Sequence, residues 1–248
     1  MNYVKGSRIK SGINVGIYFA SIFIFPSIIA VIYMIGLSIT RGTLSSEEFN
    51  ELVNSNILYI MAVSSLTTFL IILILNFKDL KKQFVLNLKN YLTYIYPLIL
   101  FVAYFVVIYA LSFIVNAINP DLAEPENNQA LIDMFNDGNK LIFILNVVIL
   151  APLVEELIFR YSLVNLLDIE KTKLKWLPYF ISAVVFAAIH EVGFITDFTV
   201  DNILLYLTYL APALVLAFGY MFTKRNIVSM IILHMIINIF ATIGIAAS

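Results

Sequence analysis

Three ionisable residues stand close together in an otherwise apolar stretch of the chain: Glu155, Glu156 and Arg160. A charge at the centre of a bilayer costs about 2.5–3.5 kcal/mol, so such residues are expected to pair or to face a polar cavity. Glu156 precedes Arg160 by four residues, which is the favourable spacing for an ion pair on a helix. Successive helical residues point in different directions, so Glu155 is left available as a general base or acid. The alternative is a salt-bridge cluster that packs helices and does no chemistry.

The chain has only two histidines, His190 and His234, and both fall in apolar stretches. Phe186 lies four residues before His190, and Asn238 lies four residues after His234, so each pair shares one face of a helix. Two hydrogen-bond donors such as His234 and Asn238, aimed at one point, could stabilise a developing oxyanion. The alternatives are a structural histidine in the core and an interhelical hydrogen bond of Asn238.

The composition shows what surrounds these residues. Of the 248 residues, 61% are hydrophobic and 12% are charged, whereas soluble domains have about 45–50% apolar and 25% charged residues. The bilayer must therefore be the solvent for most of the chain. The net charge of −1 argues against a nucleic-acid partner. The absence of cysteine excludes disulfides, thiolate metal sites and a cysteine nucleophile.

Hydropathy predicts an all-α fold, a polytopic membrane helical bundle of about seven transmembrane helices. Each predicted span has at least the roughly 20 residues that a bilayer requires. The spans are 13–39, 57–77, 91–118, 141–167, 176–195, 203–222 and 227–247. Counted from the ends of their spans, Glu155, His190 and His234 all fall in the middle third of the bilayer. The three side chains are therefore expected to converge.

Basic and acidic loops alternate between the predicted spans, which predicts a cytoplasmic N-terminus. The basic loops carry Lys5, Arg8 and Lys10, then Lys78, Lys81, Lys82 and Lys89, then Lys171, Lys173 and Lys175, then Lys224 and Arg225. The chain is expected to be a multi-pass protein of a bacterial cytoplasmic membrane. We predict a three-helix N-terminal membrane region at 1–118, an acidic external loop at 119–140 and a catalytic four-helix domain at 141–248.

Two local features of the spans have structural consequences. In the acidic loop, Leu131, Ile132 and Phe135 share one helical face, which predicts a short interfacial helix, with a solvated loop as the alternative. Pro26 and Pro152 lie inside apolar spans and are expected to kink them, Pro152 three residues before Glu155.

Taken in order, the motifs resemble those of a known family. The EExxxR, FxxxH and HxxxN patterns on successive helices are similar to those of the CAAX protease and bacteriocin-processing family, also called CPBP or Abi, of intramembrane endopeptidases. They read here as Glu155-Glu156…Arg160, Phe186…His190 and His234…Asn238. The resemblance covers about residues 141–247, the last four predicted spans.

The resemblance implies an enzyme, a CAAX-type intramembrane protease. It implies that Glu155 with His190 activates the hydrolytic water, and that His234 and Asn238 stabilise the oxyanion. The implied substrate is a membrane-anchored peptide or protein, in peptide maturation, bacteriocin processing or immunity, or peptide signalling. The residues that would support the site are Glu156, Arg160 and Phe186.

A metal-free site is favoured, with zinc as the alternative cofactor. Zinc would be held by Glu155, His190 and His234. Against it, Asn238 shares a face with His234, and a neutral amide is a poor zinc ligand but a good oxyanion donor. Two non-proteolytic functions also stay open. One is a non-catalytic membrane regulator or immunity protein, and the other is a proton-coupled transporter, although we find no inverted repeat.

Overall fold

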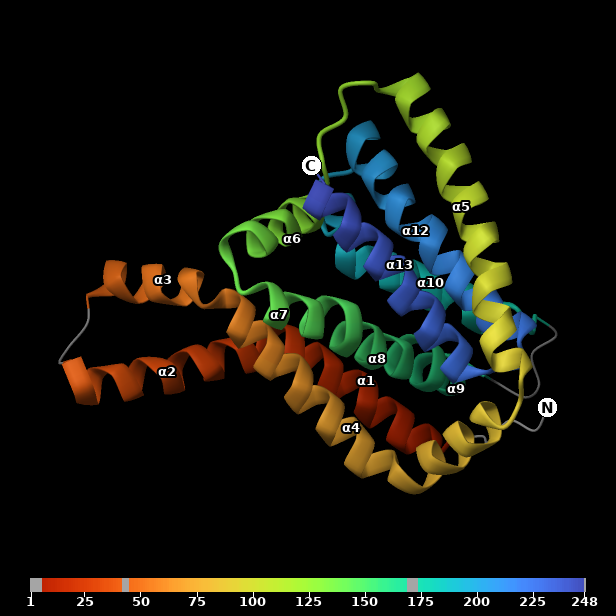
Figure 1. Cartoon of the computed structure of the whole chain (residues 1–248), viewed down its shortest axis with the longest axis horizontal. Coiled ribbons are helices and arrows are strands. Elements are labelled where there is room, and N and C mark those ends of the chain that lie inside the picture. Colours follow the sequence, from red (N-terminus) through yellow and green to blue (C-terminus); the bar gives the residue numbers. More distant parts are fainter. Residues whose placement is uncertain (1–5, 42–44, 169–173, 248) are drawn as a thin grey trace.

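The computed structural model describes residues 6–41, 45–168 and 174–247, with the backbone alone at 40, 41 and 126, and every regular element in these ranges is a helix (Figure 1). The N-terminal elements are α1 (Arg8–Phe23), α2 (Phe25–Arg41), α3 (Ser46–Ser55), α4 (Ile57–Leu88), α5 (Leu92–Ile118) and α6 (Glu126–Asp137). The following rod contains α7 (Lys140–Phe143), η1 (Ile144–Leu150), α8 (Ala151–Glu155), η2 (Glu156–Leu163) and α9 (Val164–Leu167). The last elements are α10 (Leu177–His190), α11 (Gly193–Thr196), α12 (Val200–Phe222) and α13 (Ile227–Ala247).

Five helices of the described chain are long and apolar enough to cross a membrane, and the bent pair α1–α2, counted as one span, makes a sixth. The all-α membrane bundle is therefore confirmed, whereas the count of seven is not. In the predicted span at 176–195, the apolar helix α10 has only 14 residues and ends at His190, before the short helix α11 begins at Gly193. At about 1.5 Å per residue, α10 is roughly 21 Å long and shorter than a full bilayer core.

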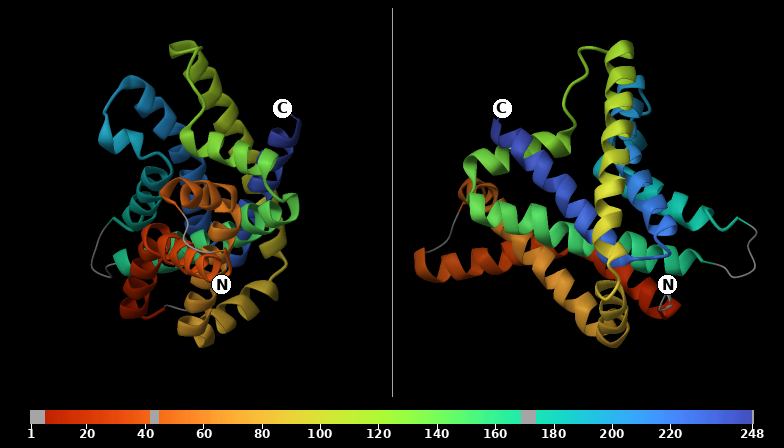
Figure 2. Two further views of the ribbon diagram at one scale, coloured as in Figure 1. Left: turned by 90° about the vertical axis from the view of Figure 1, so that its left-hand side faces the viewer. Right: turned by 45° about the vertical axis from the view of Figure 1, so that its right-hand side comes forward.

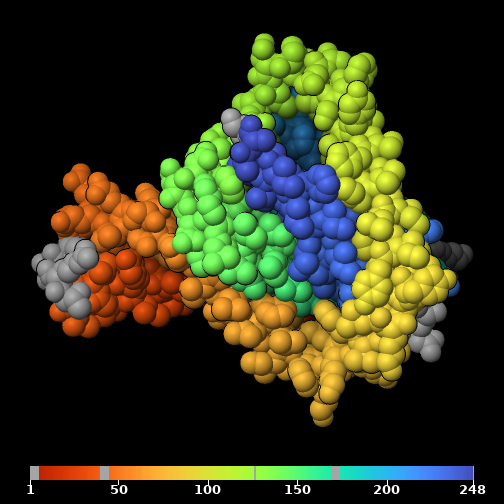
Figure 3. Space-filling model, viewed as in Figure 1, coloured from red at the N-terminus to blue at the C-terminus, as the bar shows by residue number. Residues whose placement is uncertain are grey.

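The predicted first span, 13–39, is broken near Ile24, where α1 and α2 meet at an angle of 47°. Pro26 follows this break and has no N–H to donate to the preceding turn, which accounts for the kink expected from the sequence. Beyond the break, α2 and α3 project from the body of the molecule (Figures 1 and 3). The short helix expected in the acidic loop is present as α6.

Polar contacts bring the predicted basic loops together on one side. Arg225 pairs with Asp168 at 2.7 Å, and Arg8 donates to the Asp168 carbonyl. Lys10 pairs with Asp79 near the end of α4 at 3.6 Å. Four basic segments thus share a side, while Lys5, Lys171 and Lys173 lie outside the described residues. The cytoplasmic assignment of the basic side stays a prediction.

The elements from α7 to α9 form one continuous rod through the bundle, and two of its segments are π-helices (Figures 1 and 2). Pro152 lies in α8, between the two π-helical segments η1 and η2. A proline removes one backbone donor from the helix, and a π-turn is wider than an α-turn. The rod is therefore irregular on both sides of Glu155, where the sequence predicted a local disturbance.

The N-terminal helices pack directly on this rod through buried polar side chains. On α1, Asn14 donates to Ser162 of η2 at 2.9 Å, and Asn76 of α4 donates to Asn14 at 2.9 Å. The Ser162 hydroxyl in turn donates to the Leu157 carbonyl, five residues earlier in the π-helix. All of these polar side chains are buried. Helix α1 therefore holds η2 by a hydrogen bond as well as by packing, and α4 in turn holds Asn14 of α1.

Candidate active site

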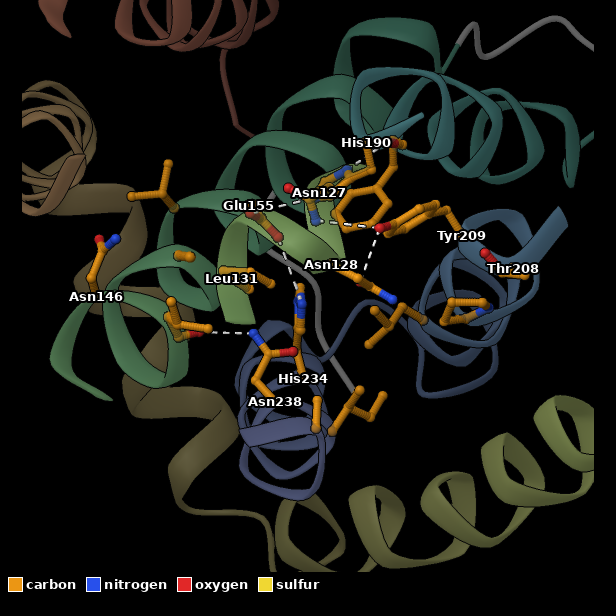
Figure 4. Close-up of a pocket in the computed structure, with 18 of the residues that line it drawn as sticks. Asn127, Asn128, Leu131, Asn146, Glu155, His190, Thr208, Tyr209, His234 and Asn238 are labelled. Atoms are coloured by element: carbon orange, nitrogen blue, oxygen red, sulfur yellow. Dashed lines mark hydrogen bonds and ion pairs between the residues drawn. The ribbon is translucent and has the colours of Figure 1, made fainter. Parts of the chain in front are cut away.

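A cavity of about 860 Å³ lies between the rod and the surrounding helices, and the conspicuous residues of the sequence meet at it. Glu155 enters it from the end of α8, His190 from the last residue of α10, and His234 and Asn238 from one face of α13 (Figure 4). Helices α1, α4, α5, α6 and α12 complete the wall with mostly apolar and uncharged polar residues. Residues from three separate segments of the sequence are thus brought to one point.

The Glu155 carboxylate lies between the two histidine rings. Its Oε1 is 3.9 Å from Nε2 of His190, and its Oε2 is 3.6 Å from Nε2 of His234. Both separations exceed a direct hydrogen bond, and a gap of this size between polar atoms can accommodate a bridging water. Glu155 and His190 are 15% and 18% exposed, so a ligand can reach them from the cavity. The sequence prediction that these three side chains converge is confirmed.

The hydrogen bonds of the Nδ1 atoms fix the orientation of both rings. His190 Nδ1 is 2.8 Å from the Phe186 carbonyl oxygen, and His234 Nδ1 is 2.9 Å from Glu156 Oε1. A carbonyl or carboxylate oxygen only accepts, so each Nδ1 carries a hydrogen. In the neutral tautomer each Nε2 therefore presents a lone pair toward Glu155. His234 Nε2 donates to an oxyanion only when the ring carries both hydrogens, which sequence spacing did not reveal.

Glu156 and Arg160 form the expected ion pair, with 3.4 Å between Arg160 Nε and Glu156 Oε2 and both side chains fully buried. The same carboxylate also binds His234 Nδ1, a second contact that the spacing of Glu156 and Arg160 did not predict. The physical reason is the π-helix that begins at Glu156: its wider turn rotates each residue less than an α-helix does. Both carboxylates can therefore reach one imidazole.

The ring of Phe186 contacts both the buried guanidinium of Arg160 and the imidazole of His190 on α10. Its ring stacks on His190 at 4.3 Å between centroids and an interplanar angle of 23°. The guanidinium of Arg160 lies 4.8 Å from the centroid of the same ring. A cation near an aromatic face is attracted by the ring quadrupole. Phe186 is thus placed between Arg160 and His190 and orients the latter ring.

Asn238 lines the cavity beside His234, but its amide nitrogen donates to the Val147 carbonyl of η1 at 2.8 Å (Figure 4). This is the interhelical hydrogen bond that the sequence left open as an alternative. An amide nitrogen has two hydrogens, so this bond leaves a second donor for a ligand. Its role in binding an oxyanion stays a prediction.

Four further cavity residues escaped the sequence reasoning. The Tyr209 hydroxyl of α12 donates to Asn128 Oδ1 at 3.0 Å and accepts from Asn127 Nδ2 at 3.4 Å. The Tyr209 ring centroid lies 5.6 Å from that of His190. On η1, Asn146 is buried, and its Oδ1 has no hydrogen-bond partner among the residues that the structure describes. The sequence signals were weak: an asparagine doublet in an acidic loop, and polar residues within apolar spans.

The positions of the possible metal ligands in the cavity bear on whether the site could bind zinc. Two imidazoles with Nδ1 bound to an acceptor and Nε2 facing a carboxylate resemble the way metal-bound histidines are oriented. Among the described residues, however, no group of three His, Cys, Asp or Glu side chains has the arrangement of a metal site. The residues could hold zinc only after Glu155, His190 and His234 moved closer together. Metal independence therefore stays a prediction for experiment.

Residues 137–240 match the family model described as Rce1-like, type II CAAX prenyl endopeptidase. The match begins at the end of α6 and runs through the rod, α10 and α12 into α13, so it contains every motif residue of the site. It confirms the resemblance that those motifs suggested. No curated protein and no solved structure gives a significant match to the chain.

Proposed function

We propose that this chain, whose residues 137–240 match the Rce1-like, type II CAAX prenyl endopeptidase family model, is a membrane peptidase in which Glu155 and His190 activate a water molecule for peptide-bond hydrolysis. The observation that carries the proposal is the position of the Glu155 carboxylate, 3.9 Å and 3.6 Å from two imidazole Nε2 atoms inside one cavity. A water in the gap beside Glu155 could donate one hydrogen bond to Oε1 and the other to His190 Nε2.

In the first step, the water oxygen bonds to the carbonyl carbon of the substrate while one of its protons moves to Glu155. The carbonyl oxygen becomes an oxyanion, and His234 and the second N–H of Asn238 are placed to donate to it. In the second step, the C–N bond breaks and the leaving nitrogen takes the proton from Glu155. The products are a carboxylic acid and an amine, the acid then passes its remaining proton to the amine to give a carboxylate and an ammonium group, and Glu155 returns to its starting state.

With hydrogens on both ring nitrogens, His234 would donate through Nδ1 to Glu156 and through Nε2 to the oxyanion. Glu156 thus orients His234, the donor to the oxyanion, and Arg160 fixes the position of Glu156 through their ion pair.

The substrate is membrane-associated, since the cavity is enclosed by helices that lie in the bilayer. We propose a peptide or protein precursor of a bacterial cytoplasmic membrane, in peptide maturation, bacteriocin processing or immunity, or peptide signalling.

The test compares Glu155→Gln with the wild type, because glutamine keeps the volume of glutamate and removes its basicity. We expect proteolytic activity to fall at least about 100-fold without loss of folded protein. Comparative peptidomics of cells carrying either form should then identify precursors that accumulate in the variant. The matched control is Glu191→Gln: this carboxylate follows His190 in sequence, is buried and does not line the cavity. Near-wild-type turnover by Glu155→Gln would exclude Glu155 as the base.

A further inference from the structure

Tyr209 of α12 contacts both His190 and the helix α6. Its ring centroid lies 5.6 Å from that of His190 (Figure 4). Its hydroxyl donates to Asn128 Oδ1 at 3.0 Å and accepts from Asn127 Nδ2 at 3.4 Å. Asn127 and Asn128 both belong to the first turn of α6. One side chain thus connects α6 to the imidazole that lies beside Glu155.

The position of His190 depends on contacts outside its own backbone. It is the last residue of α10, and the end of a helix is held by fewer backbone hydrogen bonds than its interior. Among the described residues, its ring has two aromatic neighbours. Phe186 stacks on it at 4.3 Å but belongs to the same helix, so it moves with α10. Tyr209 is the aromatic neighbour that relates His190 to a different helix.

The backbone that carries Tyr209 is weakened by a proline. Pro212 lies inside α12, and a proline cannot donate to the carbonyl four residues earlier, which here belongs to Thr208. The turn that contains Tyr209 therefore lacks one backbone hydrogen bond. A hydroxyl that both donates and accepts a hydrogen bond is held in two directions. Asn127 and Asn128 thus restrain the side chain where the helix restrains the backbone less.

We propose that Tyr209 is a positioning residue for hydrolysis: anchored by Asn127 and Asn128, its ring holds the His190 imidazole in the orientation that faces Glu155. The inference rests on the proposed peptidase function and deepens it, because it makes α6 part of the catalytic apparatus. Helix α6 ends at residue 137, where the match to the family model begins. The motif residues by themselves therefore do not imply this role.

Tyr209 acts through its ring and not as a donor to the substrate. A tyrosine hydroxyl has one hydrogen, and Asn128 accepts it. No donor is then left on Tyr209 for an oxyanion. His190 is instead restrained by two sets of contacts: Phe186, which lies against Arg160, and Tyr209, which is attached to α6.

The first test measures kcat and KM of the full chain in lipid nanodiscs, with a peptide that the wild type cleaves. Tyr209→Phe keeps the ring and removes its anchor, whereas Tyr209→Leu removes both. We expect kcat to fall about fivefold in Tyr209→Phe, the factor that corresponds to one neutral hydrogen bond. The loss should be larger in Tyr209→Leu, with KM within about twofold of the wild type in both. A wild-type kcat in Tyr209→Phe, or an effect on KM alone, would overturn the proposal.

The same anchor can be removed from α6. The double variant Asn127→Ala, Asn128→Ala should lower kcat by about the factor found for Tyr209→Phe. Combining all three substitutions should add little, because the same two hydrogen bonds are lost in each case. Full additivity would show that α6 and Tyr209 act independently, and it would contradict the coupling.

Two matched controls separate the anchor from general damage to α6 and α12. Gln129→Ala changes the next residue of α6, which is exposed and does not line the cavity. Tyr206→Phe makes the same chemical change one turn earlier on α12, where the hydroxyl donates to the Val184 carbonyl at 3.2 Å. Both controls should keep kcat within about twofold of the wild type. A loss in either control equal to that of the anchor variants would contradict the proposal.

Chemical modification reports the position of His190 without turnover. Diethyl pyrocarbonate acylates a free imidazole nitrogen, and Nδ1 of His190 is bonded to the Phe186 carbonyl, so Nε2 reacts. Because the chain has only two histidines, mass spectrometry can compare His190 with His234 as an internal reference. We expect the ratio of the two rates to rise about fivefold in Tyr209→Phe and in the double alanine variant.

The modification rates distinguish failure of this inference from failure of the proposed function. If the wild type cleaves no peptide, the proposed function fails, and a raised ratio still shows that Tyr209 and α6 position His190. An unchanged ratio in both anchor variants overturns the positioning role, whether or not the wild type cleaves peptides.

Discussion

Replacing Glu156 by glutamine removes one charge from the most deeply buried part of the site. The Glu156 carboxylate lies 3.4 Å from Arg160 Nε and 2.9 Å from His234 Nδ1, and it is fully buried. A glutamine at this position could still accept the hydrogen bond of His234, but it could not neutralise Arg160. The remaining contacts of the Arg160 side chain would be the Ala213 carbonyl at 3.4 Å and the neighbouring aromatic rings. The substitution therefore leaves a buried cation without an anion.

The expected loss follows from that burial. Removing one partner of a buried ion pair lowers the free energy of unfolding by about 3–5 kcal/mol. For a chain of this length, 1 kcal/mol shifts the midpoint of thermal unfolding by about 2–4 °C, so Tm should fall by about 6–20 °C. Replacing both partners should cost much less than replacing one, because no charge is then left buried. Glu156→Gln combined with Arg160→Met should recover most of the lost Tm.

The assay is thermal unfolding of the purified protein in one detergent, followed by intrinsic fluorescence, with proteolysis measured on the same samples. Glu155→Gln is the control, since it makes the same chemical change one residue earlier at a partly exposed position. The double variant should regain stability but not activity, because His234 then lacks its carboxylate. A Tm of Glu156→Gln within about 2 °C of the wild type would show that the pair contributes little stability.

Three other outcomes are expected. In intact cells, cysteines introduced at Ser46 and Gln129 should react with an impermeant label, and one at Lys82 should not; labelling at Lys82 alone would invert the predicted orientation. Exhaustive chelation should leave activity unchanged, whereas stoichiometric zinc with activity lost on chelation and restored by zinc would make Glu155, His190 and His234 ligands. Phe186→Leu, which removes the ring between Arg160 and His190, should lower kcat by about tenfold or more with KM little changed; an effect on KM alone would assign Phe186 to substrate binding.

Much of the fold could be predicted from the sequence, because hydropathy and length decide which segments a bilayer accepts. The predicted spans at 91–118, 203–222 and 227–247 correspond closely to α5, α12 and α13. The alternation of basic and acidic loops predicted that the basic segments lie on one side. The contacts of Asp168 with Arg225 and of Lys10 with Asp79 bring these segments together. A span must be apolar over its whole length, so its signal is local and strong.

The candidate site was visible in the sequence for the same reason. Ionisable residues in apolar spans are costly, so Glu155, His190 and His234 are conspicuous from residue type and position alone. Their depths along three spans predicted that they would meet, and the structure places both imidazole Nε2 atoms within 3.9 Å of the Glu155 carboxylate.

Tertiary structure alone decided how these side chains are oriented. The π-turn at Glu156 brings a second carboxylate to His234, and sequence spacing assumed an α-helix there. The short α10 ends at His190, although apolar residues continue beyond it. The partners of uncharged polar residues such as Asn14 and Tyr209 likewise come from distant helices. Charge and hydropathy act on each segment separately, whereas the wide helical turns and the hydrogen bonds of neutral groups depend on which helices pack against one another.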